Sequence, residues 1–174
     1  MLRNFLSAIF LHLSINAFSQ TDYFQQELRY TINATLYDDN HILRGFETIQ
    51  YTNHSKDTLQ FLYFHVWPNA FMNDQSEFVK QGVENGETDF YFSKKEEKGF
   101  IDSLDFKINN QTVAISNYNG QEDILVLELN NGLAPEQTIE ITTPFRLVIP
   151  ANFSRLGHIE QTYQMTQWYP KPAV

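Results

Sequence analysis

The stretch ELRYTINATLY at positions 27–37 decides the fold, because apolar and polar residues alternate along it. Leu28, Tyr30 and Ile32 fall on one side of an extended chain, and polar residues fall between them. Side chains of a β-strand point alternately to its two faces, so this pattern predicts a strand with one buried face. The turn residues DDNH follow, and residues 42–52 alternate again. Together they predict an antiparallel hairpin.

A second stretch, TLQFLYFHVW at 58–67, is apolar at almost every position. Such a run is typical of a central strand covered on both faces, so Phe61 and Tyr63 are expected in the core. The other residues expected there are Leu28, Tyr30, Ile32, Phe106, Val126 and Leu127.

Further strands are expected at short intervals along the rest of the chain. Residues 72–99 break the alternation and predict an excursion from the sheet, part loop and part short helix at 76–82. No long amphipathic helix is present, so the sequence predicts an all-β fold, an antiparallel two-sheet sandwich or saddle-like domain. The remaining strands are expected at 101–108, 112–116, 123–129, 137–142 continuing through 145–149, and 158–168, with a tight turn at 130–132.

Length and composition limit the possible functions. The 174 residues suffice for one domain, and the net charge of −9 disfavours nucleic acid as a partner. The absence of cysteine excludes disulfides, thiolate metal sites and a cysteine nucleophile.

The first residues resemble an export signal. Arg3 precedes an apolar run at 5–15, and Ala17-Phe18-Ser19 has the small-x-small pattern of a cleavage site. The run is too short to span a bilayer. We therefore expect a signal peptide at 1–19, one domain at 20–174, no membrane span after cleavage, and a secreted or periplasmic protein.

A search for catalytic motifs assigns no catalytic residue and no metal ligand to this chain. No H-E-x-x-H, no G-x-S-x-G and no phosphate loop occurs. His65 is expected as a hydrogen-bonded core residue, and Glu47 as a paired carboxylate or one at a sheet rim. His158 and Glu160, two positions apart, are a less favoured acid/base pair.

Three segments in order resemble the gluzincin (zinc aminopeptidase) family of metallopeptidases. They are LRYTI and LRGFETIQYTNHS at 28–32 and 43–55, TLQFLYFHVWPNAF at 58–71, and QTYQMTQWYPKPAV at 161–174. The second is similar to a bacterial branch with an L-x-x-L-Y-F-H-x-x-P-N run. The resemblance covers residues 23–174. It implies a saddle-like β domain that packs on a thermolysin-like catalytic domain, in which the zinc and the general-base glutamate would lie.

The resemblance also implies a substrate-binding residue. The family's first domain lends one glutamine to the active-site wall, near the free amine of the peptide substrate. Gln164 matches it best, with Gln161 and Gln167 as alternatives. The partners implied are the chain's own catalytic domain and a peptide, and the sequence is interpreted as truncated at Val174.

A different class of function fits the same composition. A secreted β-sandwich could bind carbohydrate or protein through exposed aromatic residues, and a purely structural adhesion domain is a third interpretation. The aromatic runs that could serve are at 63–64, 90–92 and 168–169. For a first domain of a larger enzyme, we expect Trp168 or Tyr169 to be substantially exposed.

Overall fold

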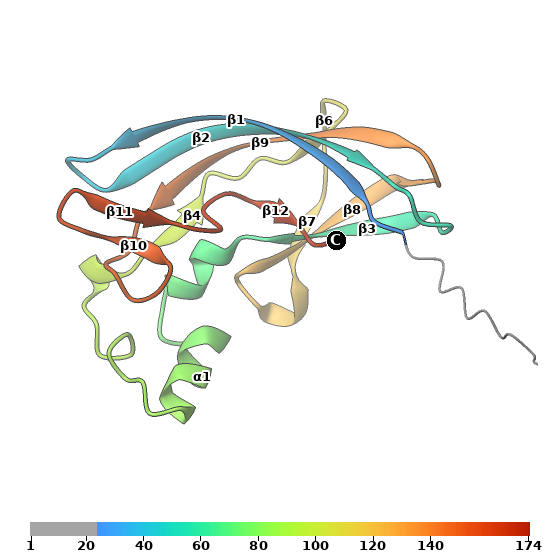
Figure 1. The fold of residues 1–174 in the computed structure, drawn as a ribbon. Coiled ribbons are helices and arrows are strands. Elements are labelled where there is room, and N and C mark those ends of the chain that lie inside the picture. Colours follow the sequence, from blue (N-terminus) through green and yellow to red (C-terminus); the bar gives the residue numbers. More distant parts are fainter. Residues whose placement is uncertain (1–23) are drawn as a thin grey trace, which may run out of the picture.

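The computed structural model describes residues 24–174 (Figure 1), so the expected signal peptide lies outside the described residues. The fold is mostly β, with antiparallel sheets and, in the part described, one α-helix. The predicted all-β, two-sheet class is confirmed. None of the described helices is long and apolar enough to cross a membrane.

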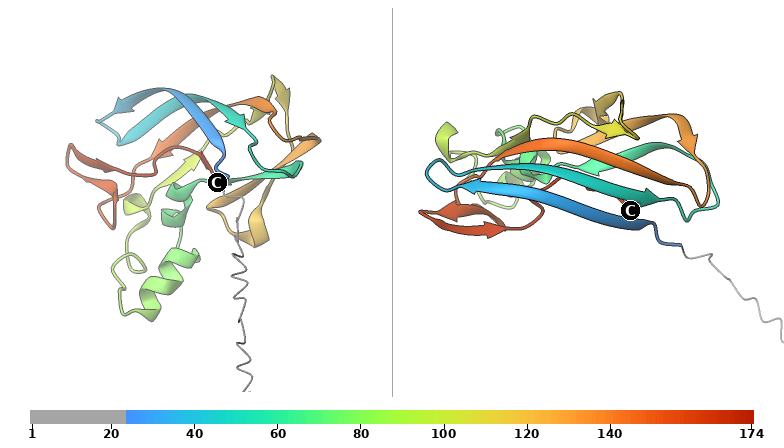
Figure 2. Two further views of the ribbon diagram at one scale, coloured as in Figure 1. Left: turned by 45° about the vertical axis from the view of Figure 1, so that its right-hand side comes forward. Right: turned by 90° about the horizontal axis from the view of Figure 1, so that it is seen from above.

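The larger sheet is built on three long antiparallel strands that arch over the molecule (Figure 2). β1 (Glu27–Tyr37) pairs with β2 (Ile42–Thr52) along its whole length, which confirms the predicted hairpin. β2 pairs with β9 (Thr138–Val148) over the same length. The far edge of β9 is covered by shorter strands: β4 (Phe100–Asp102), β5 (Lys107–Ile108) and, beyond β5, β6 (Gln111–Thr112).

The smaller sheet lies beneath the arch and has the order β12-β3-β8-β7. Its two long strands are β3 (Leu59–His65) and β8 (Ile124–Leu133), and its edges are β7 (Ile115–Asn117) and β12 (Lys171–Pro172). A separate hairpin is formed by β10 (Leu156–Ile159) and β11 (Thr162–Met165).

The excursion predicted at 72–99 is confirmed, and it projects away from both sheets (Figure 1). Its helix α1 (Glu77–Glu84) begins after Ser76, whose side chain accepts a hydrogen bond from the Val79 amide. Edge-to-face contacts among phenylalanines pack the excursion onto the core. Short 3₁₀ helices occur at Trp67–Phe71, Lys95–Glu97 and Tyr118–Gly120.

The core fills the space between the inner faces of the two sheets. Its fully buried centre includes Ile49 and Ile141 from the larger sheet and Phe64 from β3, whose ring meets Phe106 at 4.9 Å. Burial of this apolar surface is the main stabilising contribution to such a fold. Phe106 and Leu127 are buried as predicted, and Leu28, Tyr30 and Ile32 pack against the core from partly exposed positions.

The prediction that β3 is covered on both faces is wrong. Leu62, Phe64 and Val66 are buried, whereas Phe61 is 47% and Tyr63 41% exposed. A run of apolar residues shows that both faces of a strand avoid charge, but it does not show that a second layer covers both. Here only the larger sheet packs on β3, so its outer face is open.

Three strand boundaries also differ from expectation. Residues 130–132 continue β8 instead of forming a turn, with Gly132 at φ +62°. Residues 158–168 do not form one strand, because the chain reverses near Glu160, at φ +49°, within the β10–β11 hairpin. The segment 101–108 splits into β4 and β5, which pair with β9 on either side of Pro144. Proline has no N–H to donate to a neighbouring strand, so the break between β4 and β5 falls where β9 has one donor fewer.

Candidate functional site

A row of aromatic residues on the outer face of β3 leads to the candidate site. Phe61, Tyr63 and His65 alternate with the buried residues of the strand, and Trp67 follows directly at the start of a 3₁₀ helix. The β12 strand pairs beside this row, with Lys171 opposite His65, and the Ala173 amide donates to the Tyr63 carbonyl at 2.8 Å. The last described residues therefore run alongside β3 (Figure 1).

A cavity of about 310 Å³ opens at the end of the row that is formed by His65 and Trp67. His65 and Trp67 line it from one side, and Gln167, Tyr169 and the 171–174 segment line it from the other. Imidazole, indole, amide, phenol and ammonium groups can all donate hydrogen bonds, and no Asp or Glu side chain of the described residues lines the cavity. The cavity can bind carbonyl or carboxylate oxygens, and no serine, threonine or cysteine is among the described residues that line it.

Behind the cavity lies a buried carboxyl group. Tyr169 meets the ring of Tyr30 edge-to-face at 5.5 Å, and the Glu47 carboxyl lies close enough to Tyr30 to influence its ionisation. Burial, followed by these two neighbours, raises the pKa of the Tyr30 hydroxyl above its ordinary range. Within the described chain, neither the Tyr30 hydroxyl nor the Glu47 carboxyl has a hydrogen-bond partner.

Glu47 itself is 0% exposed on the inner face of β2. Its position among apolar residues was predicted, but the expectation that it would be paired or at a rim is wrong. The reason is its register between Ile32 on β1 and Thr143 on β9 in the middle of the larger sheet. Thr143 is already bonded to the Asp105 amide and the Pro144 carbonyl. Burial raises the pKa of Glu47 to about 8, so it is largely neutral at pH 7.

The three glutamines considered from the sequence occupy different positions. Gln164 is exposed on β11, opposite Gly157, and Gln161 is exposed in the hairpin turn. Gln167, with a left-handed φ of +52°, lines the cavity beside Tyr169. The structure therefore brings Gln167 to the cavity, whereas the preferred Gln164 is not among the cavity residues.

Two other histidine expectations can be compared with the structure. His158 Nδ1 donates to the backbone carbonyl of Glu160 at 3.3 Å, not to its carboxylate, so the acid/base pair is not formed. His65 is half-buried, and its buried Nδ1 has no partner among residues 24–174, contrary to the expected hydrogen bond. The described part of the chain contains no cluster of three or more His, Cys, Asp or Glu side chains suited to a metal ion.

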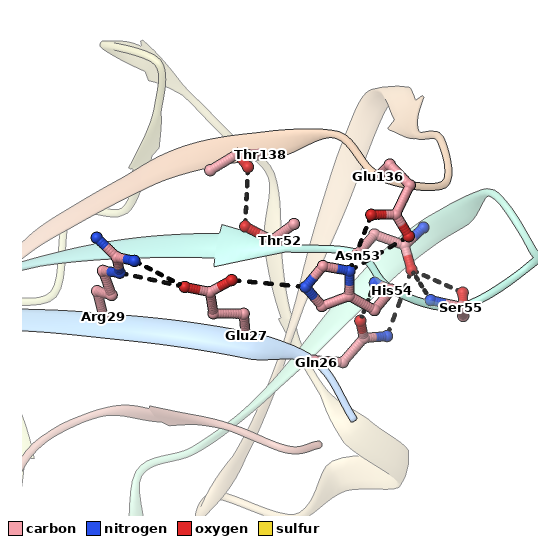
Figure 3. A network of polar contacts seen from close by, with 9 residues as sticks. All are labelled: Gln26, Glu27, Arg29, Thr52, Asn53, His54, Ser55, Glu136 and Thr138. Carbon is pink, nitrogen blue, oxygen red and sulfur yellow. Dashed lines mark hydrogen bonds and ion pairs between the residues drawn. The ribbon is translucent and has the colours of Figure 1, made fainter. Parts of the chain in front are cut away.

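A polar cluster around Asn53, at the C-terminal end of β2, has a structural role (Figure 3). Asn53 is 0% exposed; its Nδ2 donates to the Asp57 and Leu133 carbonyls, and its Oδ1 accepts from Ser55. His54 lies between the Glu27 and Glu136 carboxylates at 3.5 and 3.0 Å. This arrangement joins the β2–β3 loop, the β8–β9 loop and the start of β1, and we call it the Asn53 clasp.

The aromatic runs considered from the sequence also differ in exposure. Phe64 and Phe90 are buried, whereas Tyr91 and Phe92 are exposed at 44% and 76%. Trp168 and Tyr169 are half-buried. They pack against Phe145, Tyr30 and each other, so the expected large exposure of this pair is not found.

Comparison with known proteins adds no assignment. No family model matches the chain, and no curated protein matches it significantly. The geometry of the cavity and of the open β3 face is therefore the basis for a functional proposal.

Proposed function

We propose that residues 20–174 form the non-catalytic N-terminal domain of a secreted, zinc-dependent metallopeptidase of the aminopeptidase type. In this proposal the zinc and the catalytic residues belong to a following domain, and this domain forms one wall of the peptide-binding cleft. The signal-like first residues support export, and the three family-like segments support the enzyme class.

The observation that carries the proposal is the continuous surface formed by the open face of β3 and the cavity. Phe61, Tyr63 and Tyr118 are each at least 40% exposed, and Tyr63 meets Tyr118 edge-to-face at 5.5 Å. A row of aromatic residues with no covering layer is typical of a surface that another domain or protein covers. A polypeptide continuing past Val174 would leave beside Tyr63, so a following domain could pack on this face directly.

The cavity supports a role in peptide binding. Its lining is rich in donors, and the Gln167 amide adds an acceptor for an amine. Extended peptides are recognised through main-chain carbonyl and amide groups, which such a wall can bind. Within the proposal, Gln167 now fits the substrate-binding role better than Gln164, because it lines the cavity.

The alternative function is a secreted β-sandwich that binds carbohydrate or protein. The exposed residues Tyr91 and Phe92, with ring centroids 5.1 Å apart, favour it, since an exposed aromatic ring offers an apolar face to a ligand. This pair lies on the excursion, away from the cavity. The two proposals therefore use different surfaces and can be tested separately.

The first test is the coding sequence downstream of Val174. We expect an H-E-x-x-H motif with a further glutamate roughly twenty residues on. The protein encoded by the whole gene should bind one zinc and release N-terminal residues from peptides. A stop codon directly after Val174 would contradict the proposal and favour the binding module.

The second test separates the three glutamines in that whole protein. Replacing Gln167 with alanine should raise KM for a peptide with a free amine by roughly tenfold, the effect of about one lost hydrogen bond. Gln161→Ala and Gln164→Ala are matched controls and should leave KM unchanged. An effect confined to Gln164→Ala would restore the assignment made from the family-like motif.

A further inference from the structure

The β10–β11 hairpin is joined to the tip of the β1–β2 hairpin by a pair of stacked histidines. His41 ends the turn between β1 and β2, and His158 lies on β10. Their rings are 3.5 Å apart and inclined by 17°. Figure 1 shows the two hairpins side by side at this end of the molecule.

A tyrosine completes the contact. Tyr163, which pairs with His158 across the β10–β11 hairpin, has its hydroxyl 2.8 Å from His41 Nδ1. The same hydroxyl donates to the Asp38 carbonyl at 3.3 Å. We call His41, His158 and Tyr163 the histidine latch.

The hydrogen bonds determine where each imidazole can accept a proton. The tautomer that satisfies both contacts of the Tyr163 hydroxyl has a proton on His41 Nδ1, which donates to Tyr163 while Tyr163 donates to the Asp38 carbonyl. His158 Nδ1 likewise donates to the Glu160 carbonyl. In both rings the basic nitrogen is then Nε2, so acid adds charge to both rings without breaking either hydrogen bond.

We propose that this latch is opened by acid: when both imidazoles are protonated, their repulsion separates the β10–β11 hairpin from the β1–β2 turn. Two like charges at stacking distance repel strongly, whereas one imidazolium stacked on a neutral ring is tolerated. The hairpin leads directly to Gln167 and the cavity, so its release would alter the cleft wall. That consequence rests on the proposed function, but the latch itself does not.

The local electrostatics agree with this direction. Burial, and then the neighbouring His41, lower the pKa of His158 below its ordinary value. A lowered folded-state pKa means that the closed latch is favoured above the ordinary histidine pKa of about 6.5 and weakens as the pH falls below it. The latch should therefore be closed at pH 7.5 and destabilised near pH 5.

Other charged groups near the latch modulate the opening. Asp38 and Asp39 lie on the β1–β2 turn, and both contribute, after burial, to the raised pKa of Tyr163. Their carboxylates attract protonated imidazoles and so oppose the opening. On the hairpin, Glu160 follows His158 and carries a further carboxylate. Removal of one aspartate charge should shift the opening to higher pH.

Hydrogen exchange of the purified chain at pH 7.5 and 5.0, corrected for intrinsic rates, tests the latch. The hairpin amides of His158 and Thr166, bonded to the Pro150 and Arg155 carbonyls, should lose about tenfold protection at pH 5.0. The amides that bond β2 to β9 are the internal reference, and they should keep their protection at pH 5.0. Equal hairpin protection at both pH values would overturn the proposal.

Three variants make the test specific to the stack. His158→Phe keeps an aromatic ring but removes one charge, so the acid response should disappear. Asp38→Asn should raise the midpoint of the response. His54→Gln, at the far end of the larger sheet, is the control and should retain it. A response that persists in His158→Phe would also overturn the proposal, and neither outcome bears on zinc or peptide binding.

Discussion

Two buried polar residues, Glu47 in β2 and Asn53 directly after it, differ in whether their side chains have hydrogen-bond partners. Glu47 and Asn53 lie six positions apart and are both 0% exposed. Asn53 has partners for both ends of its amide, from Asp57, Leu133 and Ser55. The carboxyl group of Glu47 has none within residues 24–174.

The difference follows from position in the sheet. In the middle of β2, neighbouring strands use their backbone groups on each other, so a side chain on the inner face meets only other side chains. At the end of β2, loops present unpaired carbonyls and amides that a side chain can bind. Burial of a polar group is therefore destabilising at Glu47 and stabilising at Asn53.

The largest expected effect is the pH dependence that Glu47 confers on stability. Its pKa rises from 4.5 to about 8 on folding, so the folded state holds the proton more tightly. The contribution of this group is most favourable below pH 4.5 and is lost as the pH rises towards 8, by about 5 kcal/mol in total. Urea unfolding of Glu47→Gln should remove this dependence, and Glu47→Leu should be more stable than the wild type at pH 8.

Glu140→Gln, on the exposed face of β9, is the matched control and should keep the wild-type pH profile. If wild type and Glu47→Gln lose stability in parallel between pH 4.5 and 8, Glu47 is not neutral in the folded protein, and the comparison with Asn53 fails.

The next effect is the loss of the Asn53 amide. Asn53→Ala leaves the Leu133 carbonyl and the Ser55 amide without their partner, and the free energy of unfolding should fall by about 3 kcal/mol. Asn131→Ala, at an exposed position of β8, should change it by less than about 0.5 kcal/mol. Equal effects of the two variants would show that the clasp does not stabilise the fold.

A smaller effect is expected two residues before Glu47, where the inner face of β2 is closed by an aromatic ring. A Cβ added at Gly45 would lie 2.2 Å from Cζ of Phe145, its cross-strand partner. Gly45→Ala should therefore lower stability by about 2 kcal/mol through overpacking. The double variant with Phe145→Leu should recover part of the loss, and a purely additive result would exclude a steric cause.

The smallest expected effect is that of His54 in the Asn53 clasp. The hydrogen bond to Glu136, and then that to Glu27, raises its pKa above the ordinary value. This contribution is fully present below the ordinary histidine pKa of about 6.5 and disappears as the pH rises through the raised value. His54→Gln should lower the thermal midpoint slightly at pH 5.5 and leave it unchanged at pH 9. A larger decrease of the thermal midpoint at pH 9 than at pH 5.5 would show that His54 acts through packing and not through its charge.

Several features follow from the sequence alone. The alternation at 27–37 and 42–52 determines the β1–β2 hairpin and its inner face, because a pleated strand separates its residues with a period of two. The same rule places Glu47 among apolar residues. The charge and glycine pattern at 72–99 correctly indicates an excursion with one short helix.

Tertiary structure decided what covers each face and which distant residues meet. Phe61 and Phe64 look equally apolar in sequence, but only one side of β3 faces the larger sheet. Partners for Asn53, their absence at Glu47, and the contact of His41 with Tyr163, 122 positions apart, depend on how loops and hairpins come together. Local periodicity determines which side of a strand avoids water, whereas only the packed chain determines what each buried polar group can bind.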